Sequence, residues 1–225
     1  MTTTRHHGPL PTLLVGLTVV SGLVDAFSYL TLGHVFVANM TGNMIFLGFA
    51  LAGIGHITVT SSLLAVLAFA VGVALGGWLA TERPPHRGYL IAAATAAQAV
   101  LVLITAILAS TTGIGNTAAR LSLIALLALA MGGQNAVVRR LAVPGPPTTV
   151  LTGTITGLIA DAAPLPLRLR RILAVLAMVF GALLGGLLLR WVAVPAPLWL
   201  AEALLIACAA GAYFAARQPA SAVWR

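Results

Sequence analysis

Asp25 is the residue of this 225-residue sequence whose position most directly suggests chemistry. It is one of only four acidic residues and lies well inside an apolar stretch. A carboxylate within a membrane helix is costly and usually faces a cavity or a partner. Ser21, Ser28 and Tyr29 lie three or four residues away and therefore share its helix face. Two roles remain open for Asp25: a proton or cation coupling site, or an acceptor for the N–H groups of a half-helix that holds the fold together.

A second polar group interrupts the apolar sequence in the stretch FVANMTGNMIFLG. Asn39, Thr41, Gly42 and Asn43 lie there, after a segment whose β-branched and aromatic residues favour an extended conformation. Gly33 is expected to end the preceding helix. Asn39 or Thr41 is then the predicted N-cap of a short helix.

A third polar group, Thr152, Gly153 and Thr154, follows the proline-rich stretch PGPPTTV, through which a helix cannot continue. Thr152 or Thr149 is the predicted N-cap of a second short helix. Two half-helices would thus begin inside the membrane, with free N–H donors and partial positive charge suited to an anionic or strongly accepting ligand. The alternative is that these side chains only bond to neighbouring helices or to their own backbone.

The composition places these groups in a membrane protein. Hydrophobic residues make up 60% of the chain and charged residues 7%, and the mean hydropathy is +1.06. Too little polar surface is available for a soluble globule. We predict an all-α integral membrane protein with a single membrane domain over residues 1–225. Six apolar stretches have about the 20 residues needed to cross a bilayer: 12–32, 62–79, 89–109, 121–138, 172–189 and 198–216.

The basic residues act as topology signals. All twelve are arginine, and they lie at predicted helix ends, which argues against a nucleic-acid surface. Two further stretches, 34–53 and 147–163, are long enough to cross but are broken by Gly, Thr, Asn and Pro. If these two broken segments do not cross, only Arg120 and Arg190 fall on the opposite side from the rest. The positive-inside rule therefore predicts six crossings, two segments that dip in and return, and both termini in the cytoplasm.

An internal repeat is also predicted. LLAVLAFAVGVALGG from Leu63 aligns without a gap with ILAVLAMVFGALLGG from Ile172, and VDA at Val24 aligns with QNA at Gln134. Residues of about 11–110 and about 118–217 would then form two halves with three spans each. An odd number of spans makes the repeats inverted, as in many transporters. The counterpart of Asp25 is Gln134 or Asn135, both neutral, so a symmetrical two-carboxylate relay is not predicted.

Other residues receive plainer interpretations. The GxxxG spacings of Gly72 with Gly76 and of Gly181 with Gly185 predict close helix packing. Gln98 and Glu202 could line a pathway, but Glu202 is expected to reach the membrane interface. Asp161 is expected to form an ion pair with the arginines at 168, 170 and 171.

Enzymatic activity is not expected. The sequence contains no HExxH, GxSxG, P-loop or CxxC motif. We therefore expect no catalytic residues, no metal centre and no cofactor.

The stretch GLVDAFSYLTLGHVFVANMTGNMIFLGFAL, together with the later GGQNA, resembles the YoaK family of uncharacterised bacterial multi-pass membrane proteins. The resemblance covers essentially the whole chain, including the GxxDA and TGN elements. It implies a location in the bacterial inner membrane and a transport role, and it supplies no substrate.

These observations lead to one functional hypothesis and one rival. The hypothesis is a small transporter or channel for a polar or anionic solute, with its site at the half-helix starts beside Asp25 and coupling to protons through that residue. The rival is a non-transporting membrane scaffold or sensor subunit. The expected partners are the lipid bilayer, a small-molecule or ion solute and a second copy of the chain in a homodimer.

Overall fold

The computed structural model describes residues 10–54, 58–82, 86–141 and 151–218. Within these ranges the secondary structure is helical, and six of the helices are long enough and apolar enough to cross a membrane. The long helices are α1 (Leu10–Thr31), α3 (Val59–Glu82), α4 (Arg87–Thr112), α5 (Thr117–Leu141), α7 (Leu165–Trp191) and α8 (Ala196–Arg217), and the short ones are α2 (Met40–Leu51) and α6 (Leu151–Ala160).

The all-α multi-pass membrane architecture predicted from the sequence is confirmed. Each of the six predicted stretches coincides with one long helix. Helices α2 and α6 contain 12 and 10 residues. At 1.5 Å per residue they extend about 18 and 15 Å, well below the roughly 30 Å of the hydrocarbon core.

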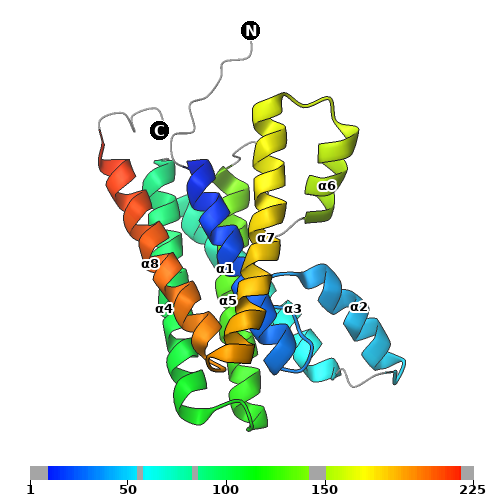
Figure 1. Ribbon diagram of the computed structural model, residues 1–225. Helices are drawn as coiled ribbons and strands as arrows, with labels where there is room; N and C mark the ends of the chain where they lie inside the picture. The colour runs from blue at the N-terminus through cyan, green and yellow to red at the C-terminus, as the bar shows by residue number, and fades with distance from the viewer. Residues whose placement is uncertain (1–9, 55–57, 83–85, 142–150, 219–225) are drawn as a thin grey trace.

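The long helices form one bundle, and the short helices lie outside it (Figure 1). Helix α1 packs against α7 and α8, and α5 packs against α3 and α4, while α4 also packs along α8. Helix α2 packs on α3, and α6 packs on α7. In Figure 1 both short helices start near mid-height on the same side of the bundle and run toward opposite ends.

Glycines allow the closest helix pairs to touch backbone to backbone. A Cβ atom added to Gly72 would lie 2.1 Å from the carbonyl oxygen of Leu129 on α5. One added to Gly181 would lie 2.3 Å from the carbonyl oxygen of Val19 on α1. Neither position has room for a side chain, so the predicted packing role of the GxxxG spacings is confirmed.

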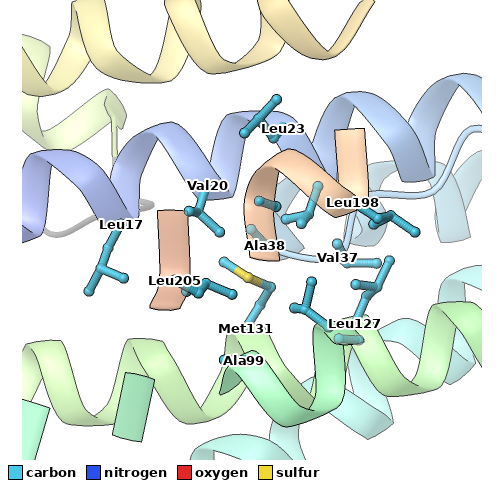
Figure 2. Close-up of a cluster of buried hydrophobic side chains, with 14 of the residues drawn as sticks. Leu17, Val20, Leu23, Val37, Ala38, Ala99, Leu127, Met131, Leu198 and Leu205 are labelled. Atoms are coloured by element: carbon cyan, nitrogen blue, oxygen red, sulfur yellow. The ribbon is translucent and has the colours of Figure 1, made fainter. Parts of the chain in front are cut away.

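Apolar side chains fill the space between α1, α5 and α8 (Figure 2). Leu17 and Val20 of α1, Met131 of α5 and Leu205 of α8 belong to this core and are almost completely buried. Polar groups at this depth are removed from water, so each needs a partner within the protein or in a ligand.

The arginines of the described residues separate by end of the bundle, as predicted, while Arg5, Arg83 and Arg225 lie outside the described residues. The starts of α4 and α7 and the end of α8 lie at one end of the bundle in Figure 1, and they carry Arg87, the arginines at 168–171 and Arg217. Arg120 and Arg190 lie at the other end, near the start of α5 and the end of α7. The predicted ion pair of Asp161 is confirmed for Arg171, whose Nη2 lies 2.8 Å from Asp161 Oδ2.

Candidate functional site

Asp25 holds the extended segment that leads into α2. Its carboxylate is only 4% exposed. Oδ1 accepts hydrogen bonds from the backbone N–H groups of Val37 at 2.9 Å and of Ala38 at 2.8 Å. Oδ2 is buried and has no hydrogen-bond partner among the residues that the structure describes. Asp25 therefore anchors backbone through one oxygen and leaves the other available.

The chain turns out of α1 as the sequence predicts and then passes through the core. Gly33 has φ +96° and His34 has φ +58°, a left-handed turn that ends the helix. The segment after the turn is not helical, and Val37 and Ala38 lie among apolar side chains (Figure 2). Buried non-helical backbone in a membrane must have its polar groups satisfied. The Asp25 carboxylate meets that requirement for two N–H groups.

Asn43 fixes the other part of this segment. The side chain is fully buried, and its amide bonds both backbone groups of Phe36. The Phe36 N–H donates to Oδ1 at 2.9 Å, and Nδ2 donates to the Phe36 carbonyl at 2.6 Å. The Phe36 ring stacks on Tyr29, with ring centroids 4.8 Å apart, and a Cβ on Gly42 would come within 2.8 Å of it. Asn43, Gly42 and Tyr29 thus position the turn before α2.

A row of buried amide and hydroxyl groups crosses the bundle near Asp25. Gln98 of α4 donates from Nε2 to Oε1 of Gln134 on α5 at 2.6 Å, and Gln134 donates from Nε2 to the Ser21 hydroxyl at 3.4 Å. Ser21 and Gln98 lie midway along α1 and α4, so the row lies near the middle of the membrane. Oε1 of Gln98 is buried without a partner in the described part of the chain. Ser21 is one helical turn from Asp25. Asp25 Oδ2 and Gln98 Oε1, which both lack a partner among the described residues, therefore lie in the same region of the bundle.

A cavity borders this polar row. It lies between α3, α4 and α5, has a volume of about 160 Å³, and includes Gln98 and Gln134 in its lining. The other walls are mostly apolar and include Gly72, Gly76 and Gly133. The close approach of α3 to α5 thereby shapes one wall of the space beside the polar row.

The remaining predicted residues occupy more open positions. Thr41 is exposed and Asn39 is half-buried, and in α6 Thr152 and Gly153 are exposed whereas Thr154 is buried. On α5 the half-buried Asn135 donates from Nδ2 to the Met131 carbonyl at 3.3 Å. The structure therefore brings Asp25, Ser21 and Gln134 into one buried region and leaves the half-helix starts at the surface of the single chain.

Among the predicted N-cap residues, Asn39 is confirmed in position, whereas Thr41 and Thr152 were wrong. Helix α2 begins at Met40, so Asn39 is the N-cap residue and Thr41 lies inside the helix. Asn39 makes no side-chain capping hydrogen bond, because Asn43 holds the preceding turn through Phe36 instead. Helix α6 begins at Leu151, so Thr152 also lies inside its helix, and Thr149 falls outside the described residues.

The prediction that Glu202 reaches the membrane interface was also wrong. The side chain is 5% exposed, and Oε2 has no partner among the described residues. Helix α8 packs against both α1 and α4, so this face of the helix is enclosed. The burial of Glu202 was hard to predict, because it lies only six residues after the helix start, where a long side chain can reach water.

Comparison with known proteins identifies the family. Residues 13–211 match the family described as "Protein of unknown function (DUF1275)". The chain belongs to this family. It is also 35% identical over 150 residues to the UPF0700 transmembrane protein YoaK of Bacillus subtilis (strain 168), a match that covers 67% of this chain and 66% of that protein. No solved structure matches. The resemblance to the YoaK family is confirmed, and the DUF1275 family carries no assigned activity.

Proposed function

We propose that the protein is a small transporter or channel for a polar or anionic solute. The observation that carries this proposal is the presence, among the described residues, of two buried acceptors without partners, Asp25 Oδ2 and Gln98 Oε1, inside the bundle. Leaving such a group unsatisfied in a dry interior costs about 1–3 kcal/mol. A solute or a proton that binds there would remove that cost, and the neighbouring cavity beside Gln98 offers space for it.

The solute should carry hydrogen-bond donors as well as acceptors. Donors are needed to satisfy the carboxylate and amide oxygens of Asp25 and Gln98. Acceptors or negative charge would suit the N–H groups at the starts of α2 and α6, near Thr41, Gly42 and Thr152. Protonation of Asp25 would let the same carboxyl group donate, which is why proton coupling is part of the proposal.

We also propose that the two halves of the chain form an inverted repeat, which would support the transport hypothesis. A Cβ on Gly22 would meet the Met178 carbonyl oxygen at 2.5 Å, and one on Gly132 would meet the Phe69 carbonyl oxygen at 2.1 Å. Gly132 is the aligned counterpart of Gly22, and Phe69 is that of Met178. Helix pairs correspond in the same way, since α1 packs on α7 as α5 packs on α3. These matched contacts support an inverted repeat, the arrangement in which many transporters alternate access to a central site.

The proposal also includes an orientation in the bacterial inner membrane. With the arginine-rich end of the bundle in the cytoplasm, both termini would be cytoplasmic. Fusion of a reporter that fluoresces only in the cytoplasm to the C-terminus should give a fluorescent protein, and a dark fusion of normal abundance would contradict this orientation.

A homodimer would cover the side of the bundle that carries the two short helices α2 and α6. Helices α2 and α6 each pack on a single helix, and Thr41, Thr152 and Gly153 are exposed. Helix starts at membrane depth are tolerated only where protein or water surrounds them, because lipid cannot bond to their N–H groups. We therefore propose that a second copy covers this face.

Cysteine cross-linking tests the homodimer. In a Cys208→Ser background, Ile45→Cys on exposed α2 should form a disulfide-linked dimer in oxidised membranes. Val100→Cys on α4 is the matched control, since Val100 is exposed to a similar degree on another face of the bundle. Equal cross-linking at both positions, or at Val100 alone, would contradict the proposed interface.

A scaffold or sensor subunit is the second candidate function. It is favoured by the bonds of Asp25 to Val37 and Ala38 and of Asn43 to Phe36, in which polar side chains only satisfy backbone. This role requires no solute at the centre of the bundle.

A thermal-stability screen separates the two candidates. The purified protein would be heated with small anions, carboxylates, amines and nucleobases over a range of pH. A ligand at about 100 times its Kd should stabilise the fold by roughly 2.7 kcal/mol. Stabilisation by one solute class that is lost in Gln98→Leu supports the transporter, while no stabilisation by any class supports the scaffold.

A further inference from the structure

A second cavity lies away from the polar row, between the start of α4 and the end of α8. Its volume is about 670 Å³. Its walls are formed largely by alanines, Ala92, Ala93 and Ala96 on α4 and Ala209 and Ala210 on α8. Because alanine has no side chain beyond Cβ, the space between the two helices stays unfilled and almost entirely apolar.

Aromatic rings form the rim of this cavity. Tyr89 and Tyr213 both line it and contact each other edge to face, with ring centroids 6.1 Å apart. The ring centroid of His86 lies 4.8 Å from that of Tyr89, and the ring centroid of Phe214 lies 5.9 Å from that of Tyr213. Aromatic side chains with polar atoms concentrate at the level of lipid headgroups. The rim therefore has the character of the membrane interface, and the alanine walls have that of the hydrocarbon region.

Positive charge lies beside the rim. The guanidinium carbon of Arg217 is 5.4 Å from the Tyr213 ring centroid, and Arg87 follows His86 at the start of α4. The ion pair seen among the described side chains joins Arg171 to Asp161 and involves neither of these two arginines. The start of α4 and the end of α8, which form the cavity, lie at the arginine-rich end of the bundle (Figure 1).

We propose that this cavity binds an anionic phospholipid of the surrounding membrane. One acyl chain would lie against the alanine walls, and the phosphate would lie at the rim between Arg217 and Arg87. Basic pockets between transmembrane helices are sites where anionic headgroups bind. Apolar walls on one side and the positive charges of Arg87 and Arg217 on the other match the two ends of such a lipid. This inference does not depend on transport.

Lipid photo-cross-linking tests the location without any change to the protein. The wild type would be reconstituted with phosphatidylglycerol that carries a diazirine on one acyl chain, and the labelled residues would be mapped by mass spectrometry. Label concentrated on residues 89–96 and 209–214 is expected. Label spread evenly over the exposed faces of α3 and α7 would overturn the proposal.

Variants test whether the cavity and Arg217 recognise the lipid. The double variant Ala96→Leu with Ala209→Leu should fill the cavity and abolish the concentrated label. Arg217→Gln should weaken retention of phosphatidylglycerol about fivefold relative to phosphatidylcholine. Arg190→Gln is the control, because Arg190 stacks on Trp191 in the same way at the opposite end, 4.8 Å from its ring centroid. Equal losses in the two arginine variants would contradict a headgroup site at Arg217.

Discussion

Gly72→Ala is expected to destabilise the folded protein by about 1–3 kcal/mol, a typical cost of overpacking a tight interface. The added methyl group would lie 2.1 Å from the carbonyl oxygen of Leu129, which belongs to the backbone of α5 and cannot rotate away. Helix α3 would have to move away from α5 along its whole contact. Thermal or denaturant unfolding in detergent would measure the loss.

Gly77→Ala provides the matched control. Gly77 is on the same helix, and an added Cβ meets no atom within 4 Å. Alanine is the better helix former, so this variant should be neutral or slightly more stable. If both variants lost equal stability, helix propensity rather than backbone contact would govern these positions, and the packing account would be wrong.

Asp25→Leu is expected to cost more, about 2–6 kcal/mol, because two buried N–H groups would each lose an acceptor at about 1–3 kcal/mol. Those groups belong to Val37 and Ala38, which bond to the same carboxylate oxygen. Leucine is close in size to aspartate and offers no acceptor. The segment before α2 should detach, which protease sensitivity near Phe36 would report together with the loss of thermal stability.

Asp25→Asn distinguishes the structural role of this residue from a role in transport. The amide oxygen can accept both N–H bonds, so the variant should stay folded with most of its stability. It cannot ionise, so any proton coupling at this position should be lost. A variant as unstable as Asp25→Leu would show that the charge itself holds the segment.

The six long helices could be predicted from the sequence because membrane spans depend on length and hydropathy, which are local properties. The turn at Gly33 was predictable for the same reason, since a glycine can adopt the positive φ found there. The close glycine contacts of α3 and α7 were also predictable, because GxxxG is a spacing along one helix. Their partners, α5 and α1, required the structure.

The candidate site depended on contacts between distant segments, and these were predicted only in part. The sequence left two roles open for Asp25. Its carboxylate does accept backbone N–H groups, but these belong to Val37 and Ala38 in the segment before α2 and not to the half-helix itself. Asn43 was predicted as a ligand group, and the structure places it on the backbone of Phe36. No spacing rule connects Gln98 with Gln134, because the two residues meet only when α4 packs on α5.

The most direct test of transport is solute flux in proteoliposomes. Wild type and Asp25→Asn would be reconstituted at equal amounts, and uptake of the solute class found in the stability screen would be followed with and without an imposed proton gradient. We predict saturable uptake that the gradient accelerates in the wild type and no longer accelerates in Asp25→Asn. Uptake by both proteins equal to that of empty liposomes, with both proteins folded, would contradict the transporter and leave the scaffold as the function of this bundle.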